Sequence, residues 1–194
     1  MDYNIFKLML LSVIISFLGY MTENIWLMFT KGYMDNRNMV FPFLSGYGIL
    51  VVGFYLIFGL PSENGFDILY YMQAFFTVSL GEILLGTLTE KYLGIVYWNY
   101  SWIPLHLTKY TSLPTSLGFA FLIMLFMRYA FTPAMDAISL LPKGMLCHTA
   151  CFLFVIINLD TLHGFMEMRK SHKSYTLWRI ELPRNEKDTS VIYR

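Results

Sequence analysis

Long apolar runs separated by short polar links dominate this chain. Residues 5–29 are apolar almost without interruption until Glu23, and about 20 such residues, as a helix, cross a bilayer core about 30 Å thick. Pro42 would stand in the first turn of a second span, where its missing N–H does no harm. The pattern predicts an all-α bundle of five transmembrane helices, with spans near residues 5–29, 42–60, 67–92, 114–134 and 144–165.

Composition places the chain in a membrane. Hydrophobic residues make up 56% of its 194 residues, whereas an ordinary soluble domain is about 45–50% apolar. The formal net charge is only +1. The chain therefore lacks the excess of basic residues that is typical of a nucleic-acid-binding domain. We therefore expect a multi-pass protein of the cell membrane, a bacterial inner membrane, with the lipid bilayer around it and no nucleic-acid partner.

Lys and Arg are distributed unevenly among the polar links that connect the predicted spans. Cytoplasmic loops of membrane proteins carry the excess of Lys and Arg. With the N-terminus outside, the outer links hold essentially only Lys143, whereas the inner links hold Lys31, Arg37, Lys91 and Lys109. The pattern predicts a transmembrane domain over residues 1–166 and a basic cytoplasmic tail over residues 167–194, in which the stretch SYTLWRIEL forms either a short strand or a surface segment.

Three acids interrupt the apolar runs at similar depth, namely Glu23, Glu82 and Asp160. A charge near the middle of a bilayer costs on the order of 2.5–3.5 kcal/mol, so such groups normally face the protein interior and have partners. Grouped acids repel one another unless some are protonated or a cation lies among them. Arg37 and Lys91 are the candidate cations at the inner end of these spans.

Glu82, Gly86 and Glu90 follow one another at intervals of four residues, which places them on one face of a helix. The loop at residues 94–113 follows, with the tyrosines and tryptophans that favour the membrane interface. Two interpretations stay open. The acids either line a polar pocket that opens to the cytoplasm, or Glu90 and Glu23 mark the water-exposed ends of their helices.

Motifs for metal or nucleotide chemistry are missing from the sequence. There is no HExxH zinc motif, no phosphate-binding GxxxxGK[ST] loop and no GxSxG nucleophile motif. His148 and His163 are about four turns apart on one predicted helix, so they cannot share an ion. Cys147 and Cys151 read as buried thiols rather than a disulfide. We expect no metal and no cofactor.

A series of short motifs runs along the chain in a fixed order. It comprises Glu23, Asn36-Arg37, Pro42-Phe43-Leu44-Ser45-Gly46-Tyr47-Gly48, Glu82, Gly86, Glu90-Lys91, Trp98-Asn99-Tyr100-Ser101, Pro104 and Ser116. From about Gly19 to about Asp160 this order resembles a family of small bacterial polytopic membrane proteins described as putative ABC-transporter permeases. The chain departs from the family pattern in its loop, where Asn99 replaces an Asp, His106 an Asn and Lys109-Tyr110 a Gly-Arg. The resemblance implies transport, with a separate ATPase, another membrane partner or a second copy of the chain.

We expect small-solute transport through a polar pocket that faces the cytoplasm. The residues expected to bind the solute are Glu23, Asn36, Arg37, Glu82, Trp98, Asn99, Tyr100 and Asp160. Two alternatives stay open. One is a membrane enzyme that acts on a lipid or isoprenoid, with Glu82, Glu90 and His106 as its catalytic residues. The other is a non-catalytic subunit or regulator of a membrane complex.

Overall fold

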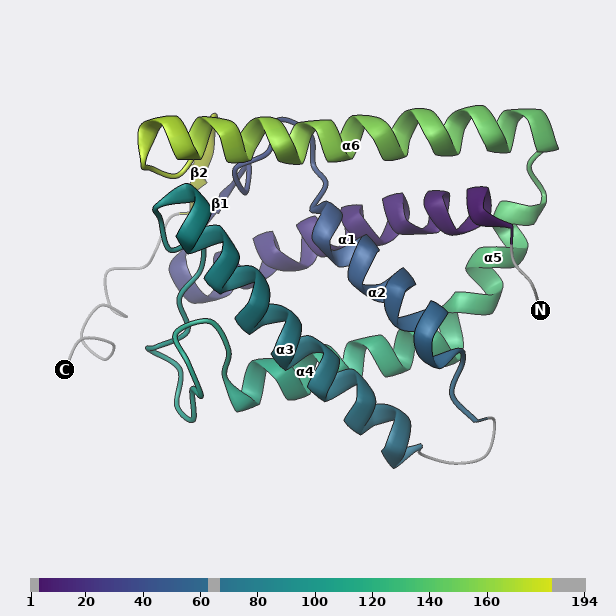
Figure 1. Cartoon of the computed structure of the whole chain (residues 1–194), viewed down its shortest axis with the longest axis horizontal. Coiled ribbons are helices and arrows are strands. Elements are labelled where there is room, and N and C mark those ends of the chain that lie inside the picture. The colour runs from purple at the N-terminus through teal and green to yellow at the C-terminus, as the bar shows by residue number, and fades with distance from the viewer. Residues whose placement is uncertain (1–3, 63–66, 183–194) are drawn as a thin grey trace.

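The computed structural model describes residues 4–62 and 67–182 of the chain. Its helices are α1 (Ile5–Lys31), α2 (Ser45–Phe58), α3 (Ile68–Leu93), α4 (Leu113–Leu125), α5 (Phe131–Ser139) and α6 (Lys143–Ser171). A π-helical turn, η1 (Phe126–Ala130), joins α4 to α5. Two short strands, β1 (Tyr33–Asp35) and β2 (Arg179–Glu181), pair in antiparallel orientation at one end of the bundle (Figure 1). The expected helical fold therefore carries a small sheet as well.

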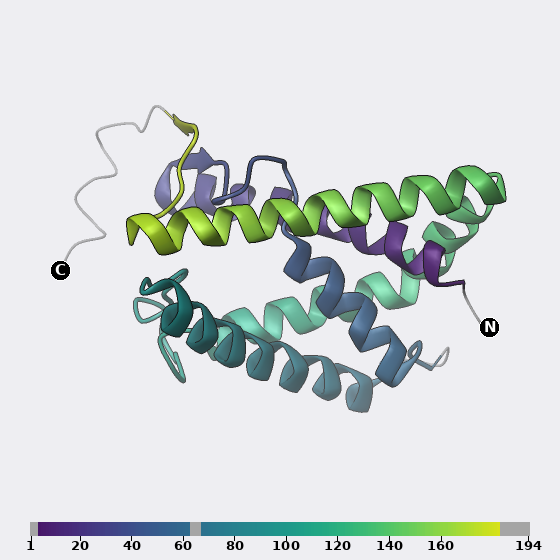
Figure 2. The same ribbon diagram turned by 45° about the horizontal axis from the view of Figure 1, so that its top comes forward.

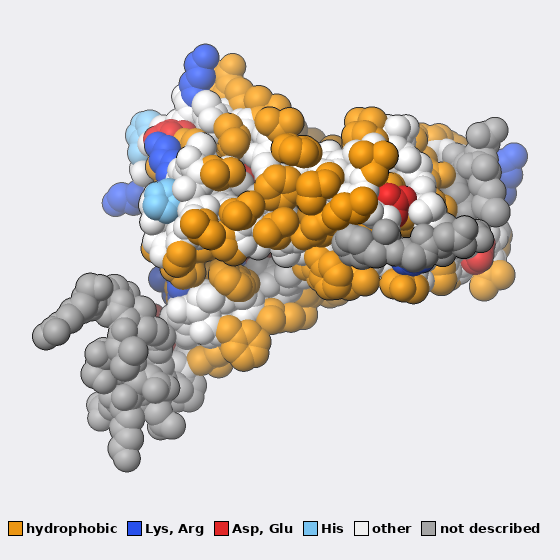
Figure 3. Space-filling view, turned by 90° about the horizontal axis from the view of Figure 1, so that it is seen from below, with side chains coloured by type: hydrophobic (Ala, Val, Ile, Leu, Met, Phe, Trp, Pro, Cys, Tyr) orange, Lys and Arg blue, Asp and Glu red, His pale blue; other side chains and the backbone are white. Residues whose placement is uncertain are grey.

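Within the described residues, four segments are long and apolar enough to cross a membrane, namely Ile5–Lys31, Ile68–Leu93, Leu113–Ser139 and Lys143–Ser171. A space-filling view shows a broad band of hydrophobic side chains between charged groups at the two ends (Figure 3). These four candidate spans are consistent with a multi-pass membrane protein. Four of the five predicted spans appear as long helices.

The second predicted span has a different form. Helix α2 has 14 residues, and at 1.5 Å per residue it is about 21 Å long, shorter than a bilayer core. Pro42, expected in its first turn, lies three residues before the helix begins at Ser45. A proline disfavours the helical conformation of the residue before it, here Phe41, so the chain stays non-helical at 40–44.

The helices form two groups. Helix α1 packs most extensively against α2 and α6, and α3 packs most extensively against α4, while fewer contacts join α3 to α2 and α6. Viewed obliquely, α1 and α6 form one layer, α3 and α4 form another, and α2 lies between them (Figure 2). We refer to α1, α2 and α6 as the first group and to α3 and α4 as the second group.

One end of the bundle, which we call the apolar end, is closed by hydrophobic packing. It contains the beginnings of α1, α3 and α6, the end of α2 and the whole of α5. The core there includes the fully buried side chains of Leu11, Ala74, Ala120, Phe131, Met135 and Ala150. Lys7 Nζ donates a hydrogen bond of 2.7 Å to Ser139 Oγ at its rim.

The opposite end, which we call the polar end, contains the last turns of α1, α3 and α6. Gly32 and Gly94 end α1 and α3 with φ near +70°, a conformation that glycine adopts without strain. The strands and the loop at residues 94–112 also lie there. The polar end carries most of the described cations, namely Lys31, Arg37, Lys91, Lys109, Arg169, Lys170, Lys173 and Arg179.

Candidate functional site

Glu23 of α1 has two close partners at the polar end. Arg37 Nη2 lies 3.0 Å from Glu23 Oε2, and Tyr47 Oη donates a hydrogen bond of 2.6 Å to Glu23 Oε1. The Arg37 side chain is 15% exposed, so the ion pair is largely shielded from solvent. Of the two candidate cations, Arg37 therefore pairs with an acid. Lys91 instead lies against the ring of Tyr92.

The backbone after β1 holds Arg37 in this position. Arg37 and Asn38 both adopt left-handed backbone conformations, and the Arg37 N–H donates a hydrogen bond of 2.9 Å to Asp35 Oδ1. Burial alone would lower the pKa of Arg37, but Glu23, Tyr97 and Asp35 outweigh it and raise that pKa above its ordinary value. The guanidinium therefore stays charged at every physiological pH.

Asn36 ties this turn to the tail of the chain. Its Nδ2 donates to the carbonyls of Met39 and Tyr175, at 2.8 and 3.1 Å, and its Oδ1 accepts from the Leu177 N–H at 3.0 Å. Asn38 Oδ1 accepts from the Tyr175 N–H in the same way. Asn36 thus fixes the turn that carries Arg37 against the segment at residues 175–177.

Asp160 of α6 binds backbone rather than another side chain. Its carboxylate accepts hydrogen bonds from the N–H groups of Val40 and Phe41, at 2.8 to 3.1 Å. One turn later, Gly164 lets the Asn38 carbonyl come so close that a Cβ would clash with it. Unsatisfied N–H groups are costly at membrane depth, so Asp160 stabilises the non-helical segment that precedes α2.

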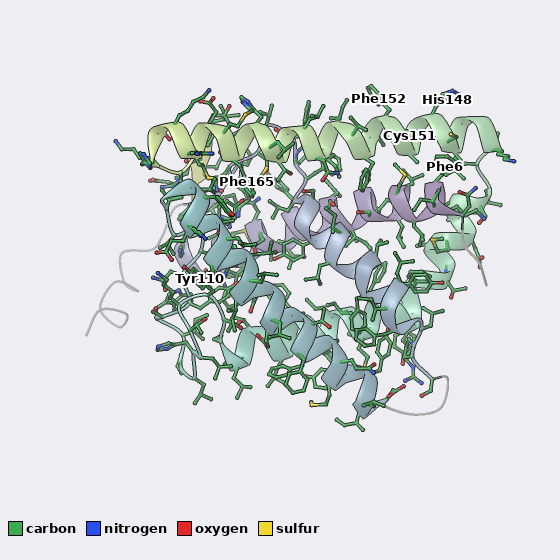
Figure 4. The ribbon with its side chains drawn as sticks, in the orientation of Figure 1. Phe6, Tyr110, His148, Cys151, Phe152 and Phe165 are labelled. Atoms are coloured by element: carbon green, nitrogen blue, oxygen red, sulfur yellow. The ribbon has the colours of Figure 1, made fainter. Side chains whose placement is uncertain are left out.

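Glu82 of α3 lies under the folded-back loop of the second group. Its Oε2 accepts hydrogen bonds from Thr111 Oγ1 at 2.6 Å and from Ser116 Oγ at 3.2 Å. These two hydroxyls are fully buried and lie 2.8 Å apart. The Tyr110 ring covers Gly86, where a Cβ would overlap it, and Figure 4 shows Tyr110 beside α3 at the polar end.

Glu90 lies at the outer edge of the same loop. It forms an ion pair of 2.7 Å with Lys109 Nζ and accepts a hydrogen bond from Tyr110 Oη. Both members of the ion pair are more than one-third exposed. Three consecutive loop residues, Lys109 to Thr111, therefore bind the face of α3 that carries Glu82, Gly86 and Glu90.

Tyr100 is within electrostatic range of an acid from each group of helices. Burial raises the pKa of Tyr100, Glu23 and Glu82 raise it further, and Arg37 lowers it, so all three charged groups lie within electrostatic reach of this phenol. The phenol stays neutral and able to donate a hydrogen bond. We call Glu23, Arg37, Tyr47, Glu82, Tyr100, Thr111 and Ser116 together the polar centre.

The model of the family described as Putative ABC-transporter type IV matches residues 10–165 of this chain. The chain belongs to this family. The match includes every residue of the polar centre and ends before the tail, in agreement with the resemblance found in the motifs. No curated protein and no solved structure matches the chain.

The remaining predicted residues of this family member lie in the loop. Trp98 Nε1 donates to the Tyr110 carbonyl at 2.8 Å, which braces the loop over α3. Asn99 is exposed, and its Oδ1 accepts from the Ser101 N–H within a turn. His106 is exposed as well, and among the described residues the hydrogen-bond partner of its Nδ1 is the Ile103 carbonyl, 3.1 Å away.

Sequence reasoning missed Tyr47 and Thr111 as partners of the two acids. A signal for Thr111 exists, because the hydroxyl-rich stretch of residues 108–116 directly precedes an apolar helix. The described residues contain no group of three or more His, Cys, Asp or Glu side chains placed to hold a metal ion. The chemistry available at the polar centre is that of two carboxylates, a guanidinium, hydroxyls and phenol rings.

Proposed function

We propose that this chain is the membrane-embedded part of a small-solute permease, and that its solute passes through the polar centre. One observation carries the proposal: the two acids of the polar centre belong to different groups of helices. Glu23 is on α1 with Arg37 and Tyr47, and Glu82 is on α3 with Thr111 and Ser116. Transporters commonly bind their solute near mid-membrane, where two bundles meet and rock against each other.

The short helix α2 supports the same proposal. Non-helical backbone at membrane depth is tolerated where it is buried in protein or lines a water-filled cavity, and interrupted helices form the binding sites of many transporters. Here the segment at residues 40–44 leads into α2, and Tyr47, in the first turn of α2, binds Glu23. The interruption thus lies directly beside the polar centre.

The distribution of cations indicates the orientation. Eight described Lys and Arg residues lie at the polar end, whereas Lys7, Arg128 and Lys143 lie toward the apolar end. By the excess of positive charge on the cytoplasmic side, the polar end faces the cytoplasm and the N-terminus lies outside. In this orientation the proposed pocket at the polar centre would open to the cytoplasm, and an ATPase partner would bind at the polar end.

The proposal is tested by the access of water to Ser116, which touches Glu82. Cys147 and Cys151 are first replaced by Ser, and Ser116→Cys is then introduced. A membrane-impermeant thiol reagent is applied to right-side-out and to inside-out vesicles. We expect labelling from both sides, because a permease exposes its centre to each side in turn.

Ala120→Cys is the matched control, since Ala120 is as deeply buried as Ser116 and lies one turn further along α4. It should stay unlabelled from both sides. Labelling of Ser116→Cys from one side only would contradict the permease and would favour a one-sided enzyme or receptor site. Labelling no faster than that of the control would also contradict it.

A further inference from the structure

Glu82 differs from the other acids in its partners. Glu23 faces Arg37, Glu90 faces Lys109, and Asp160 binds backbone N–H groups. Among the described residues Glu82 forms no ion pair, and its hydrogen-bond donors are the neutral hydroxyls of Thr111 and Ser116. A carboxylate at membrane depth normally has a compensating positive charge. Glu82 is therefore the acid with which a cationic ligand can form an ion pair.

Aromatic rings belong to the polar centre. Tyr100 is within electrostatic reach of Glu82 and of Tyr47. The Tyr47 ring centroid lies 5.9 Å from that of Phe119 on α4. The faces of such rings attract ammonium groups, most strongly when water is excluded. The rings can therefore contribute to binding a cationic ligand.

Ser79 gives an independent sign of a ligand. It lies three residues before Glu82 on α3, about 60° away around the helix, and so on the same side. Its side chain is 7% exposed, and its Oγ has no hydrogen-bond partner among the described residues. Leaving a buried hydroxyl without a partner is costly. A ligand with an N–H donor would satisfy this oxygen together with Glu82.

We propose that the polar centre binds an organic cation through a primary ammonium group. Glu82 is its counter-ion, Ser79 accepts one of its hydrogen bonds, and Tyr47 and Tyr100 cover its alkyl and cationic surface. The inference rests on the proposed permease, because it names the class of solute that the permease carries.

The test uses the purified full chain in lipid nanodiscs and n-butylammonium as the probe, followed by isothermal titration calorimetry. n-Butanol is the neutral analogue of equal length, and butyrate is the anionic one. We expect saturable binding of butylammonium, at least about tenfold weaker binding of butanol, and no binding of butyrate. Equal binding of butanol and butylammonium would overturn the proposal.

Two variants test whether butylammonium binds at Glu82. Glu82→Gln should weaken butylammonium binding at least about tenfold, as expected when one partner of a desolvated charge pair is lost. Glu167→Gln is the matched control, since Glu167 pairs with the exposed Lys170 on α6, and it should bind as the parent does. Unchanged affinity in Glu82→Gln would overturn the proposal.

A second variant covers the case in which Glu82→Gln does not fold. Tyr100→Leu should weaken binding about fivefold through the lost ring face, and Tyr100→Phe should restore it. Equal affinities for the two would contradict the site. Failure of this inference is distinct from failure of the permease: two-sided labelling without cation binding refutes only the ligand, and cation binding with one-sided labelling refutes only transport.

Discussion

The apolar end and the polar end of the bundle are held together by different chemistry. At the apolar end, helices of both groups share one continuous core of Leu, Met, Phe and Ala side chains. At the polar end, a small apolar cluster around Tyr20, Met39 and Leu44 is accompanied by ion pairs and side-chain hydrogen bonds. The apolar end is thus closed by dense packing, and the polar end is closed largely by directional ion pairs and hydrogen bonds.

The difference indicates which end opens more easily. Within a bilayer, helices gain little from hydrophobic association, and packing and hydrogen bonds decide their contacts. Dense packing is lost over many atoms at once when helices separate, whereas a hydrogen bond can be exchanged for water. We therefore expect the polar end to open at lower cost than the apolar end.

The largest expected effect comes from breaking the Glu23–Arg37 pair. Arg37→Met leaves a shielded carboxylate without its cation, and removal of one partner of a buried pair costs about 3–5 kcal/mol. The free energy of unfolding, measured by circular dichroism in mixed micelles, should fall by about 4 kcal/mol. The double variant Glu23→Gln/Arg37→Met should recover most of this loss, and an equal or greater loss would contradict the pairing.

A slightly smaller loss is expected at the apolar end. Phe131 is fully buried in the shared core, and truncation of such a ring costs about 3 kcal/mol through lost contacts and the cavity that remains. The same unfolding measurement should show this decrease for Phe131→Ala and less than half of it for Phe131→Leu. A loss below about 1 kcal/mol for Phe131→Ala would show that this core does not close the apolar end.

Substitution of Asp160 tests whether this residue has a structural or a solute-binding role at the polar end. Asp160→Ala frees the N–H groups of Val40 and Phe41, and we expect a loss of about 2 kcal/mol in the free energy of unfolding. Asp160→Asn keeps one acceptor oxygen and should lose about half as much. Full stability of Asp160→Ala would instead leave the acid available for a solute.

The smallest effect is expected at the exposed edge of the loop. Lys109 and Glu90 form a short ion pair, but both are more than one-third exposed, and such pairs contribute about 0.2–1 kcal/mol. Lys109→Ala should therefore change the free energy of unfolding by less than about 1 kcal/mol, and less still at high salt. A loss comparable to that of Arg37→Met would show that the loop, not the Glu23 pair, holds the polar end.

The helices were foreseeable because their determinants are local. An apolar run of more than 20 residues has few alternatives to a helix in lipid, so α1, α3 and α6 lie close to their predicted ranges. The start of α2 was not foreseeable, since the non-helical segment before it depends on Asp160, some 120 residues away. Strand β2 falls within the stretch SYTLWRIEL, but its partner β1 lay in a link with no strand signal of its own.

The candidate site was foreseeable in its charges but not in its partners. Glu23 and Glu82 stand out because charges are rare in apolar runs, and Arg37 stands out as a cation in the link at their inner end. Which hydroxyls reach Glu82 depends on the fold of the loop, and that fold depends on the Tyr110 ring lying over Gly86. Spacing alone does not give this contact. Asp160 carried the same signal as Glu82, although its contacts are with backbone.

The difference between the two ends is tested most directly by spin-label distances across the two groups of helices. In the background without native cysteines, Lys91→Cys and Lys170→Cys report on the polar end, and Ile68→Cys and Lys143→Cys report on the apolar end; all four positions are exposed. Adding Arg37→Met should lengthen the polar-end distance and leave the apolar-end distance unchanged, and adding Phe131→Ala should do the reverse. Unchanged distances at both ends, or a joint increase at both ends with either substitution, would contradict two separately closed ends.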